Sequence, residues 1–364
     1  MSVFPNEHIR VKRTERRVSL IGLTEYGSAF ALALVARNCA TKLTLVDKHY
    51  EKAKGEALDL QDALPFLPDI HLTYSSDIRA TANSHVVVIT VGQPFTSEYS
   101  SRHDLIEHNA PRVAEVAFRA ASVSPHAVIL IGTDPIDVMT YVAACAAFQA
   151  RPQFPKGYRV IGLGTGLDIA RMRAEIAIKA NVTSSDVSAN GVGEHGIHFI
   201  PLWRYCLIRG MPVHEVCPDL ASVAMKQAIA TKVKQACSRI VKGKPEGTTR
   251  GLAECMADLS QALLTGVGNI RTVTTRVTAQ HVAGIKGEVY MSVPCKIDAE
   301  GVAGILPFEV DPIERAALLE AARVLSEAQA KAERVLSSLD EYKGIVSVGL
   351  PSAALRSVRS LPLR

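Results

Sequence analysis

The sequence predicts an α/β protein: a doubly wound parallel sheet, followed by a C-terminal mixed α+β domain. Three observations lead to this fold class. Apolar segments at 86–90, 127–131 and 160–163 alternate with helical patterns at 102–122 and 136–149. A glycine turn joins an apolar run to a helical stretch near the N-terminus, and a late segment is rich in Val, Thr and Tyr. Strands that alternate with helices indicate a parallel sheet with right-handed crossovers.

The first strand, turn and helix have the pattern of a phosphate-binding turn. Residues 18–21 form a short apolar run, Gly22 and Gly27 bound the turn, and residues 28–38 form a helical stretch rich in Ala and Leu. Glycines at these places let the backbone approach a pyrophosphate, as at the start of a dinucleotide-binding (Rossmann) fold. The N-terminal domain is therefore predicted to bind a dinucleotide.

Two side chains near this turn bear on the cofactor. Asp47 follows a second apolar strand at 42–46, where a carboxylate accepts the ribose hydroxyls and repels a 2′-phosphate. Thr24 takes the place of the central glycine, and its Cβ stands where the pyrophosphate approaches the backbone. We therefore expect NAD, and not NADP, with an affinity that Thr24 weakens.

The rest of the chain divides at changes of composition. It has 364 residues, 48% of them hydrophobic, which is enough for two domains. Helical patterns follow at about 222–241, 254–264 and 312–339, with the strand-favouring stretch at 272–293 between the last two. The predicted parts are an N-terminal arm at 1–17, an NAD-binding domain at 18–163, a substrate domain at 164–339 and a C-terminal tail at 340–364.

Two further motifs carry the chemistry. Asp168 and Arg171 stand three positions apart and so share one face of a predicted helix. His195 follows Gly193 and Glu194 and precedes Gly196, in a loop whose backbone can bend sharply. Taken alone, the Asp-x-x-Arg pair is more often a solvated ion pair. Together with a hydride donor, these groups can reduce a 2-keto acid: Asp168 orients His195, His195 protonates the keto oxygen, and Arg171 binds the acid bidentately.

With these residues in view, the chain resembles the lactate/malate dehydrogenase family of L-2-hydroxyacid dehydrogenases. The resemblance runs from about residue 18 to about residue 339, and its order and spacing carry it. It includes the segments GEALDLQ (55–61), TANS (81–84), SR (101–102), DPID (134–137) and SVPC (292–295). The resemblance implies catalysis by His195 as acid and base, with Asp168 supporting the imidazolium, Arg171 holding the substrate carboxylate and Arg102 polarising the carbonyl.

The resemblance also implies where substrate and cofactor bind. The loop from Gly92 to Arg102 closes over the substrate in this family. Six residues before the loop arginine, malate enzymes carry a second arginine and lactate enzymes usually a glutamine. Here that position is Thr96, or Phe95 because the loop is one residue longer, and neither can pair with a second carboxylate. Further residues assigned by the resemblance are Thr248 beside the substrate and, for the cofactor, Gly92 and Asn109.

A second function remains open because the chain departs from the family at the site. Asp134 stands where the family has an asparagine that contacts the substrate carbonyl, and an ionised carboxylate cannot donate that hydrogen bond. Thr24 disturbs the phosphate turn. The first hypothesis is an active NAD-dependent L-2-hydroxyacid dehydrogenase; the alternative is a catalytically impaired paralogue that acts as a ligand-binding or interaction protein.

Composition argues against other classes. The 41 basic and 36 acidic residues are nearly balanced, and the basic residues form no runs with interleaved aromatics, so we expect no nucleic acid. We also expect no membrane span. Seven scattered cysteines fit reduced thiols in the cytoplasm. His195 and His198 lack a third ligand, so we expect no metal and interpret His198, Trp203 and the cysteines as packing residues. The expected partners are a small 2-keto or 2-hydroxy acid and further copies of the chain, in a homodimer or homotetramer.

Overall fold

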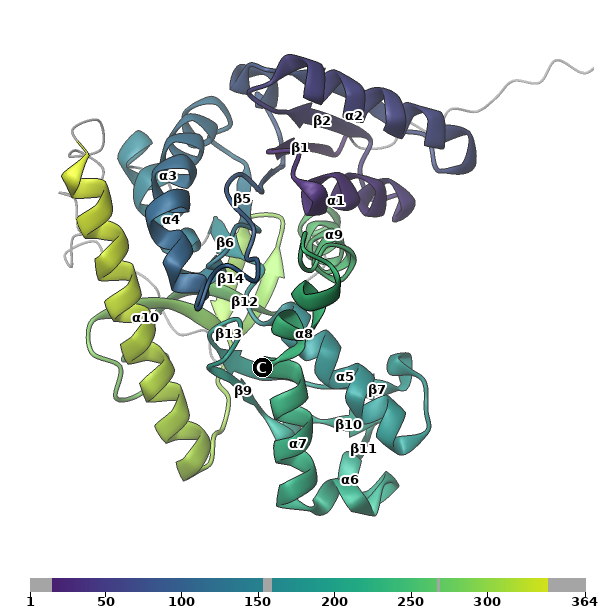
Figure 1. Cartoon of the computed structure of the whole chain (residues 1–364), viewed down its shortest axis with the longest axis vertical. Helices are drawn as coiled ribbons and strands as arrows, with labels where there is room; N and C mark the ends of the chain where they lie inside the picture. The colour runs from purple at the N-terminus through teal and green to yellow at the C-terminus, as the bar shows by residue number, and fades with distance from the viewer. Residues whose placement is uncertain (1–14, 153–158, 267–268, 340–364) are drawn as a thin grey trace, which may run out of the picture.

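A long mixed sheet runs through the protein, with helices on both of its faces (Figure 1). The computed structural model describes residues 15–152, 159–266 and 269–339. The predicted tail at 340–364 and the predicted arm, except for residues 15–17, lie outside the described residues.

The N-terminal part of the sheet is parallel and doubly wound, which confirms the predicted fold class. Its strands are β1 (Arg17–Ile21), β2 (Lys42–Val46), β3 (His71–Ser75), β4 (Val86–Ile89), β5 (Val128–Ile131) and β6 (Val160–Gly162). They follow the order β3-β2-β1-β4-β5-β6, and each neighbouring pair is parallel. The order reverses between β1 and β4, and the carboxyl ends of such strands form the crevice where these folds bind ligands.

Helices cover both faces of this part. They are α1 (Glu25–Ala36), α2 (Tyr50–Ala63), α3 (Ile106–Val123) and α4 (Ile136–Ala150), with short 3₁₀ segments η1 (Leu64–Phe66), η2 (Ile78–Thr81) and η3 (Arg102–Leu105). α1 begins at Glu25, earlier than predicted, because the Thr24 side chain caps it. α2 was not predicted, since Ala53, Ala57 and Leu60 are its buried residues and give a weak apolar pattern.

The C-terminal part combines helices with several short strands and two long ones, β12 and β13. Its elements are α5 (Gly166–Ala180), η4 (Ser184–Asp186), β7 (Val187–Ser188), β8 (Gly191–Gly193), β9 (Phe199–Pro201), η5 (Trp203–Tyr205), β10 (Leu207–Ile208), β11 (Met211–Pro212), α6 (Val213–Val216), η6 (Pro218–Ala221), α7 (Val223–Lys234), α8 (Ala236–Gly243), α9 (Arg250–Thr265), β12 (Asn269–Thr278), β13 (Glu288–Asp298), β14 (Gly301–Ile305) and α10 (Pro312–Ser338). Strands β11, β10 and β7 form a small separate sheet.

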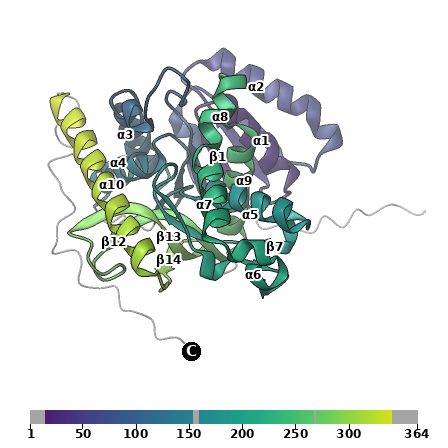
Figure 2. The same ribbon diagram turned by 60° about the horizontal axis from the view of Figure 1, so that its bottom comes forward.

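The helix predicted at 222–241 is wrong as one element, because it divides at Gln235 into α7 and α8. The two helices bury different faces. Ile229 and Val233 of α7 join a second apolar cluster in the C-terminal part, with Met172 of α5. Cys237 of α8 lines the pocket described below. Figure 2 shows α7 beside α5, on the side of the molecule away from α10.

The two parts share one sheet. β12 pairs antiparallel with β6 through Thr274 and Gly162, and β13 pairs with β12 and, at Ser292, with Gly193 of β8. The last helix of the described residues, α10, begins at a capping box formed by Asp311 and packs along α3 and α4 (Figure 1). The sheet therefore places the turn after β8 close to the carboxyl ends of the N-terminal strands.

Gly162 lies at the junction between the parts and leaves no room for a side chain. A Cβ at this position would lie 2.2 Å from Thr140 Oγ1 and 3.0 Å from Thr274 Cβ. We predict that Gly162→Ala lowers the free energy of unfolding by about 1–3 kcal/mol, because overpacking forces β6 away from β12. Thermal unfolding would measure the change. In the control Gly55→Ala, on α2, the new Cβ meets open space, so an equal loss of stability there would contradict this account.

Candidate functional site

The turn after β1 is built for close backbone contact. Gly22 has a φ of +95°, and a Cβ there would lie 2.7 Å from the backbone nitrogen of Val91, after β4. A Cβ at Gly27 would lie 2.6 Å from the Gly22 carbonyl oxygen. Only glycine fits both positions. The two predicted glycines therefore bring α1 close to β1 at the crevice between β1 and β4.

Thr24 uses its hydroxyl inside the turn. Its Oγ1 accepts a hydrogen bond from the Gly27 N–H at 3.3 Å and lies 3.4 Å from the Thr90 carbonyl oxygen. Free N–H groups at a helix N-terminus bind phosphates. Thr24 thus occupies one of the N–H donors at the start of α1.

Asp47 lies beside the same turn. Its carboxylate accepts the Leu23 N–H at 3.1 Å and the His49 N–H at 3.0 Å. β2 ends directly before Asp47, as the sequence indicates. The structure therefore brings Gly22, Thr24, Gly27 and Asp47 together at one end of the sheet.

Gly92 and Asn109 organise the start of the predicted substrate loop. Asn109 is fully buried on α3, where its Oδ1 accepts the Gln93 N–H at 2.7 Å and its Nδ2 donates to the carbonyl oxygens of Gln93 and Asp134. Gly92 has a φ of +118°, and a Cβ there would meet Asn109 Oδ1 at 2.6 Å. Asn109 thus supports the loop and the backbone of Asp134.

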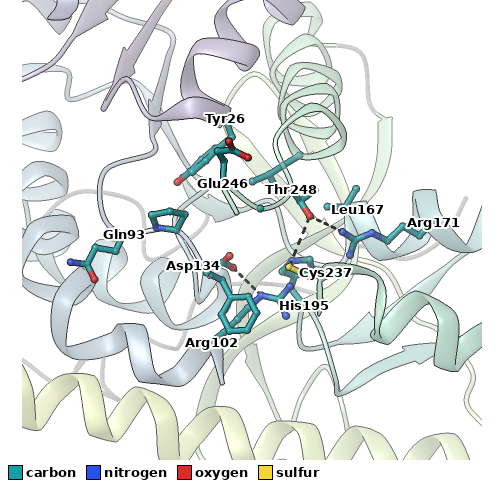
Figure 3. A pocket seen from close by; sticks show the side chains of 15 residues that line it. Tyr26, Gln93, Arg102, Asp134, Leu167, Arg171, His195, Cys237, Glu246 and Thr248 are labelled. Carbon is teal, nitrogen blue, oxygen red and sulfur yellow. Dashed lines mark hydrogen bonds and ion pairs between the residues drawn. The ribbon is translucent and has the colours of Figure 1, made fainter. Parts of the chain in front are cut away.

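A pocket opens between this loop and the C-terminal part (Figure 3). Five of its lining residues are predicted site residues: Arg102, Asp134, Arg171, His195 and Thr248. Thr96 is not among the residues that line it; its Oγ1 accepts the Glu98 N–H at 3.4 Å instead. Phe95, the alternative occupant, lines the pocket. The other lining residues are Tyr26, Gln93, Pro94, Gly132, Leu167, Cys237, Glu246, Gly247 and Leu252.

His195 and Asp168 form a buried pair. The Nδ1 atom of His195 lies 2.6 Å from Asp168 Oδ2, and both side chains are almost fully buried. A carboxylate at Nδ1 keeps the proton on that nitrogen in the neutral imidazole and leaves Nε2 for other partners. The pair comes from α5 and from the turn between β8 and β9.

Arg171 lies on the same face of α5 as Asp168. Its Nη1 is 3.4 Å from Asp168 Oδ1, and its Nη2 donates to Thr248 Oγ1 at 3.2 Å. Its side chain is 14% exposed. The guanidinium therefore stands at the pocket wall with part of its donor fork directed at Thr248 (Figure 3).

Arg102 closes the pocket from the loop side. Its Nε lies 3.4 Å from Asp134 Oδ1, and its guanidinium lies 5.3 Å from the centre of the Phe95 ring, within cation–π distance. Burial is the largest influence on the pKa of Arg102 and lowers it, but the surrounding negative groups, Asp134 first among them, together outweigh burial, and the net shift is upward. The sequence had not indicated this pairing between Arg102 and Asp134.

Asp137, which the sequence reasoning missed, holds the backbone beneath His195. Its Oδ2 accepts the His195 N–H at 2.8 Å, and its Oδ1 accepts the hydroxyls of Thr274 and Ser292 at 2.5 and 3.3 Å. Burial raises its pKa to about 6. The sequence signal that could have identified Asp137 is a carboxylate two residues after Pro135, at the start of a helix.

Other residues of the pocket carried no sequence signal. Tyr26 fills the space beside the glycine turn and donates its hydroxyl to the Thr90 carbonyl oxygen at 3.1 Å. The Cys237 thiol lies 4.0 Å from Thr248 Oγ1. Glu246 is exposed at the rim. Their positions depend on how distant segments meet.

The sequence predicts that His198 is a packing residue, but its side chain has a charged partner. It forms an ion pair with Glu194, which also contacts His103. Within residues 15–152, 159–266 and 269–339, His, Cys, Asp and Glu form no group of three that could hold a metal. In the same ranges, every helix is too short or too polar to cross a bilayer.

Comparison with known proteins finds similarity along both parts of the chain. Residues 16–153 match the family described as lactate/malate dehydrogenase, NAD binding domain, and residues 165–352 match the alpha/beta C-terminal domain of lactate/malate dehydrogenase. A malate dehydrogenase of Thermomicrobium roseum is 36% identical over 313 residues, which cover 86% of this chain and 96% of that protein.

Two further relatives are named as lactate dehydrogenases. The human L-lactate dehydrogenase A-like 6A is 31% identical over 316 residues, 86% of this chain and 92% of its own length. The crystal structure of MGS-M5, a lactate dehydrogenase from a Medee basin deep-sea metagenome library, aligns with a TM-score of 0.79 at 26% identity. That alignment covers 87% of this chain and 99% of the other.

The buried carboxylate of Asp137 makes the stability depend on pH. Because its folded-state pKa is raised from 3.8 to about 6, the folded protein binds this proton more tightly than the unfolded chain, and stability falls as the pH rises through this window. An asparagine can still accept the His195 N–H and donate to Thr274. We predict that the difference in free energy of unfolding between Asp137→Asn and the wild type shifts by about 3 kcal/mol in favour of the variant from pH 4 to pH 7.

Urea unfolding at the two pH values would measure this difference. Asp59→Asn on α2 removes an exposed carboxylate and should leave the wild-type pH dependence unchanged. A pH dependence that is the same in Asp137→Asn and wild type would show that Asp137 does not titrate in this window.

Proposed function

Because the chain belongs to the lactate/malate dehydrogenase family, we propose that it interconverts a 2-keto acid and an L-2-hydroxy acid, with His195 as acid and base. The family is one of NAD-dependent oxidoreductases, and NAD is the cofactor. The observation that carries the proposal is the convergence of Arg102, Arg171 and His195 on one pocket. A proton donor and two guanidinium groups are what a keto acid requires.

The residues of the N-terminal turn fit the cofactor. Gly22 and Gly27 keep the backbone free of side chains, and Asp47 lies beside the turn. We assign the pyrophosphate to the turn and the adenine ribose to Asp47. Thr24 already occupies the Gly27 N–H, so we expect weaker binding than in an all-glycine turn. When bound, NADH supplies the hydride for the keto carbon.

His195 handles the proton. In the direction of reduction, its Nε2 gives a proton to the keto oxygen, and in oxidation the same nitrogen takes the proton back. The 2.6 Å contact with Asp168 holds the ring in place and balances the imidazolium charge. The burial of both side chains keeps water away from the pair.

The two arginines bind and polarise the substrate. Arg171 presents its fork beside Thr248 and can bind a carboxylate through two parallel hydrogen bonds. Arg102 reaches the pocket from the loop and stabilises negative charge that develops on the keto oxygen. We assign Thr248 to contact with the carbon skeleton of the substrate.

A second candidate is a catalytically impaired member of the family that binds ligands without efficient turnover. The observation that favours it is the contact between Arg102 and Asp134. A guanidinium already paired with a carboxylate offers less positive charge to a keto oxygen. The substrate must then compete with Asp134 for Arg102.

The charges around the pocket favour a monocarboxylic substrate. Arg102 and Arg171 are the arginines that line the pocket, and both have the assigned roles above, while Asp134 and Glu246 are acidic. Phe95 faces the pocket where a second arginine would be needed. An unpaired distal carboxylate would cost several kcal/mol in this site.

We predict that NADH oxidation is faster with pyruvate or phenylpyruvate than with oxaloacetate, by at least roughly tenfold in kcat/KM. Phe95→Arg places a guanidinium in the pocket and should shift the preference toward oxaloacetate. The control Ser97→Arg adds the same single charge at an exposed position of the loop and should leave the substrate preference unchanged. A wild type that prefers oxaloacetate contradicts the assignment of the substrate class.

We predict that Asp134→Asn raises kcat for reduction roughly tenfold. The amide releases Arg102 and can donate a hydrogen bond to the keto oxygen, which the ionised carboxylate cannot. Asp258→Asn is the control, because Asp258 pairs with Arg271 outside the pocket. Rates of NADH oxidation under saturating keto acid measure both variants. An unchanged kcat in Asp134→Asn would mean that Asp134 does not restrain Arg102.

Assembly into a homodimer or homotetramer, residence in the cytoplasm and the domain boundaries of the arm and the tail stay predictions. They rest on the family resemblance and on composition.

A further inference from the structure

A buried carboxylate connects the neighbours of two candidate catalytic residues. Glu194 directly precedes His195, and His103 directly follows Arg102 in η3. The Oε1 atom of Glu194 lies 2.8 Å from His103 Nε2, although the two residues are 91 positions apart. The contact joins the segment that carries Arg102 to the turn that carries His195.

The other oxygen of Glu194 closes its own turn. Oε2 pairs with Nδ1 of His198, at the far end of the turn between β8 and β9. The Phe199 N–H donates to the Gly196 carbonyl oxygen at 3.1 Å in the same turn. One carboxylate therefore holds the turn together and ties it to η3.

Gly196 adds a second contact between the same two segments. It has a φ of +127°, and a Cβ there would lie 2.6 Å from Arg102 Nη1. A side chain at this position would push the Arg102 guanidinium away from the turn, and the positive φ itself favours glycine. The separation between Arg102 and His195 is thus set by the Glu194–His103 contact and by close packing at Gly196.

The charge on Glu194 is retained despite burial. Its side chain is 8% exposed. Burial alone would raise its pKa, but hydrogen bonds from His103 and His198 outweigh this and lower the pKa to about 2. Buried ion pairs of this kind add little net stability compared with apolar residues, so a positioning role explains them better than a stabilising one.

We propose that Glu194 is a positioning residue, which through His103 and His198 holds Arg102 and His195 at the separation that the keto group requires. The inference rests on the proposed function, because it takes Arg102 and His195 as the groups that meet the keto oxygen. Misplacement of a catalytic group by about 1 Å can cost a hundredfold in rate.

Charged groups on other elements also face this cluster, and they bear on its protonation. They are Lys234 of α7 and Glu320 of α10 near His198, and Arg102 and Asp137 near Glu194. The hydrogen bond with Glu194 raises the pKa of His198. In Glu194→Gln that pKa should fall toward the ordinary value of a histidine, which NMR titration of the imidazole signals would detect.

The kinetic test compares single and double variants with pyruvate or phenylpyruvate, whichever the wild type prefers. Glu194→Gln should lower kcat about tenfold and raise KM for the keto acid, with the Kd for NADH changed less than about twofold. His103→Gln keeps an N–H donor and should retain more activity than His103→Ala. The double variant His103→Ala/Glu194→Gln should have the same kcat as the more impaired single variant, because both substitutions break the same contact between Glu194 and His103.

The control Asp186→Asn removes a carboxylate that bridges Thr183 and Arg209 on the C-terminal surface. It should leave kcat and KM as in wild type. If Glu194→Gln fails to fold, the pair His103→Ala and His103→Gln carries the test, because His103 is partly exposed.

Three results would overturn the inference. Equal activity of His103→Ala and wild type would do so, as would additive losses in the double variant, or a lowered melting temperature with unchanged kcat and KM in Glu194→Gln. A wild type that is inactive with every keto acid overturns the proposed function and the inference together. An active wild type with unaffected variants overturns the inference alone.

Discussion

The contact between Asp168 and His195 is the interaction on which the site depends. The two residues come from α5 and from the turn after β8, and their side chains meet at 2.6 Å in the interior. They can meet because the sheet is continuous: β12 pairs with β6, and β13 pairs with both β12 and β8. Asp137 of the N-terminal part then reaches across to the backbone of His195. His195 is thus held by both parts of the chain.

The charges in the pocket are arranged in opposed pairs. Asp168 contacts both His195 and Arg171, and Asp134 contacts Arg102. In the proposed mechanism, the first arrangement supports the His195 imidazolium and places Arg171 to bind a carboxylate. The second restrains Arg102, the group proposed to polarise the substrate. Under the proposed function, a keto acid must replace Asp134 as the partner of Arg102, and the balance between these two contacts decides whether the protein is an efficient or a poor catalyst.

Residues joined by short-range patterns could be predicted from the sequence. Among the tertiary contacts of the site, the pairing of Asp168 with His195 was expected from the two motifs and the family resemblance, and the others were not. The glycine turn, the strand before Asp47 and the pairing of Asp168 with Arg171 follow from local spacing. The contacts of Arg102 with Asp134 and of Glu194 with His103 join positions far apart in the chain, and no periodicity indicates them. The sequence assigns the substrate-facing position of the loop first to Thr96, whereas Phe95 is the residue that lines the pocket. One inserted residue in the loop accounts for this shift of register. Helix α2 was missed because it buries mainly alanines along its inner face.

The central claim is that this chain transfers hydride to the keto carbon while His195 supplies the proton. The most direct measurement follows deuterium from NADH labelled at C4 into the 2-hydroxy acid, for the wild type and for His195→Asn. The account predicts deuterium at C2 of the product with the wild type, and almost none with His195→Asn even though that variant still binds NADH. A wild type that binds NADH but transfers no deuterium to any 2-keto acid, or a His195→Asn variant as active as the wild type, would contradict it.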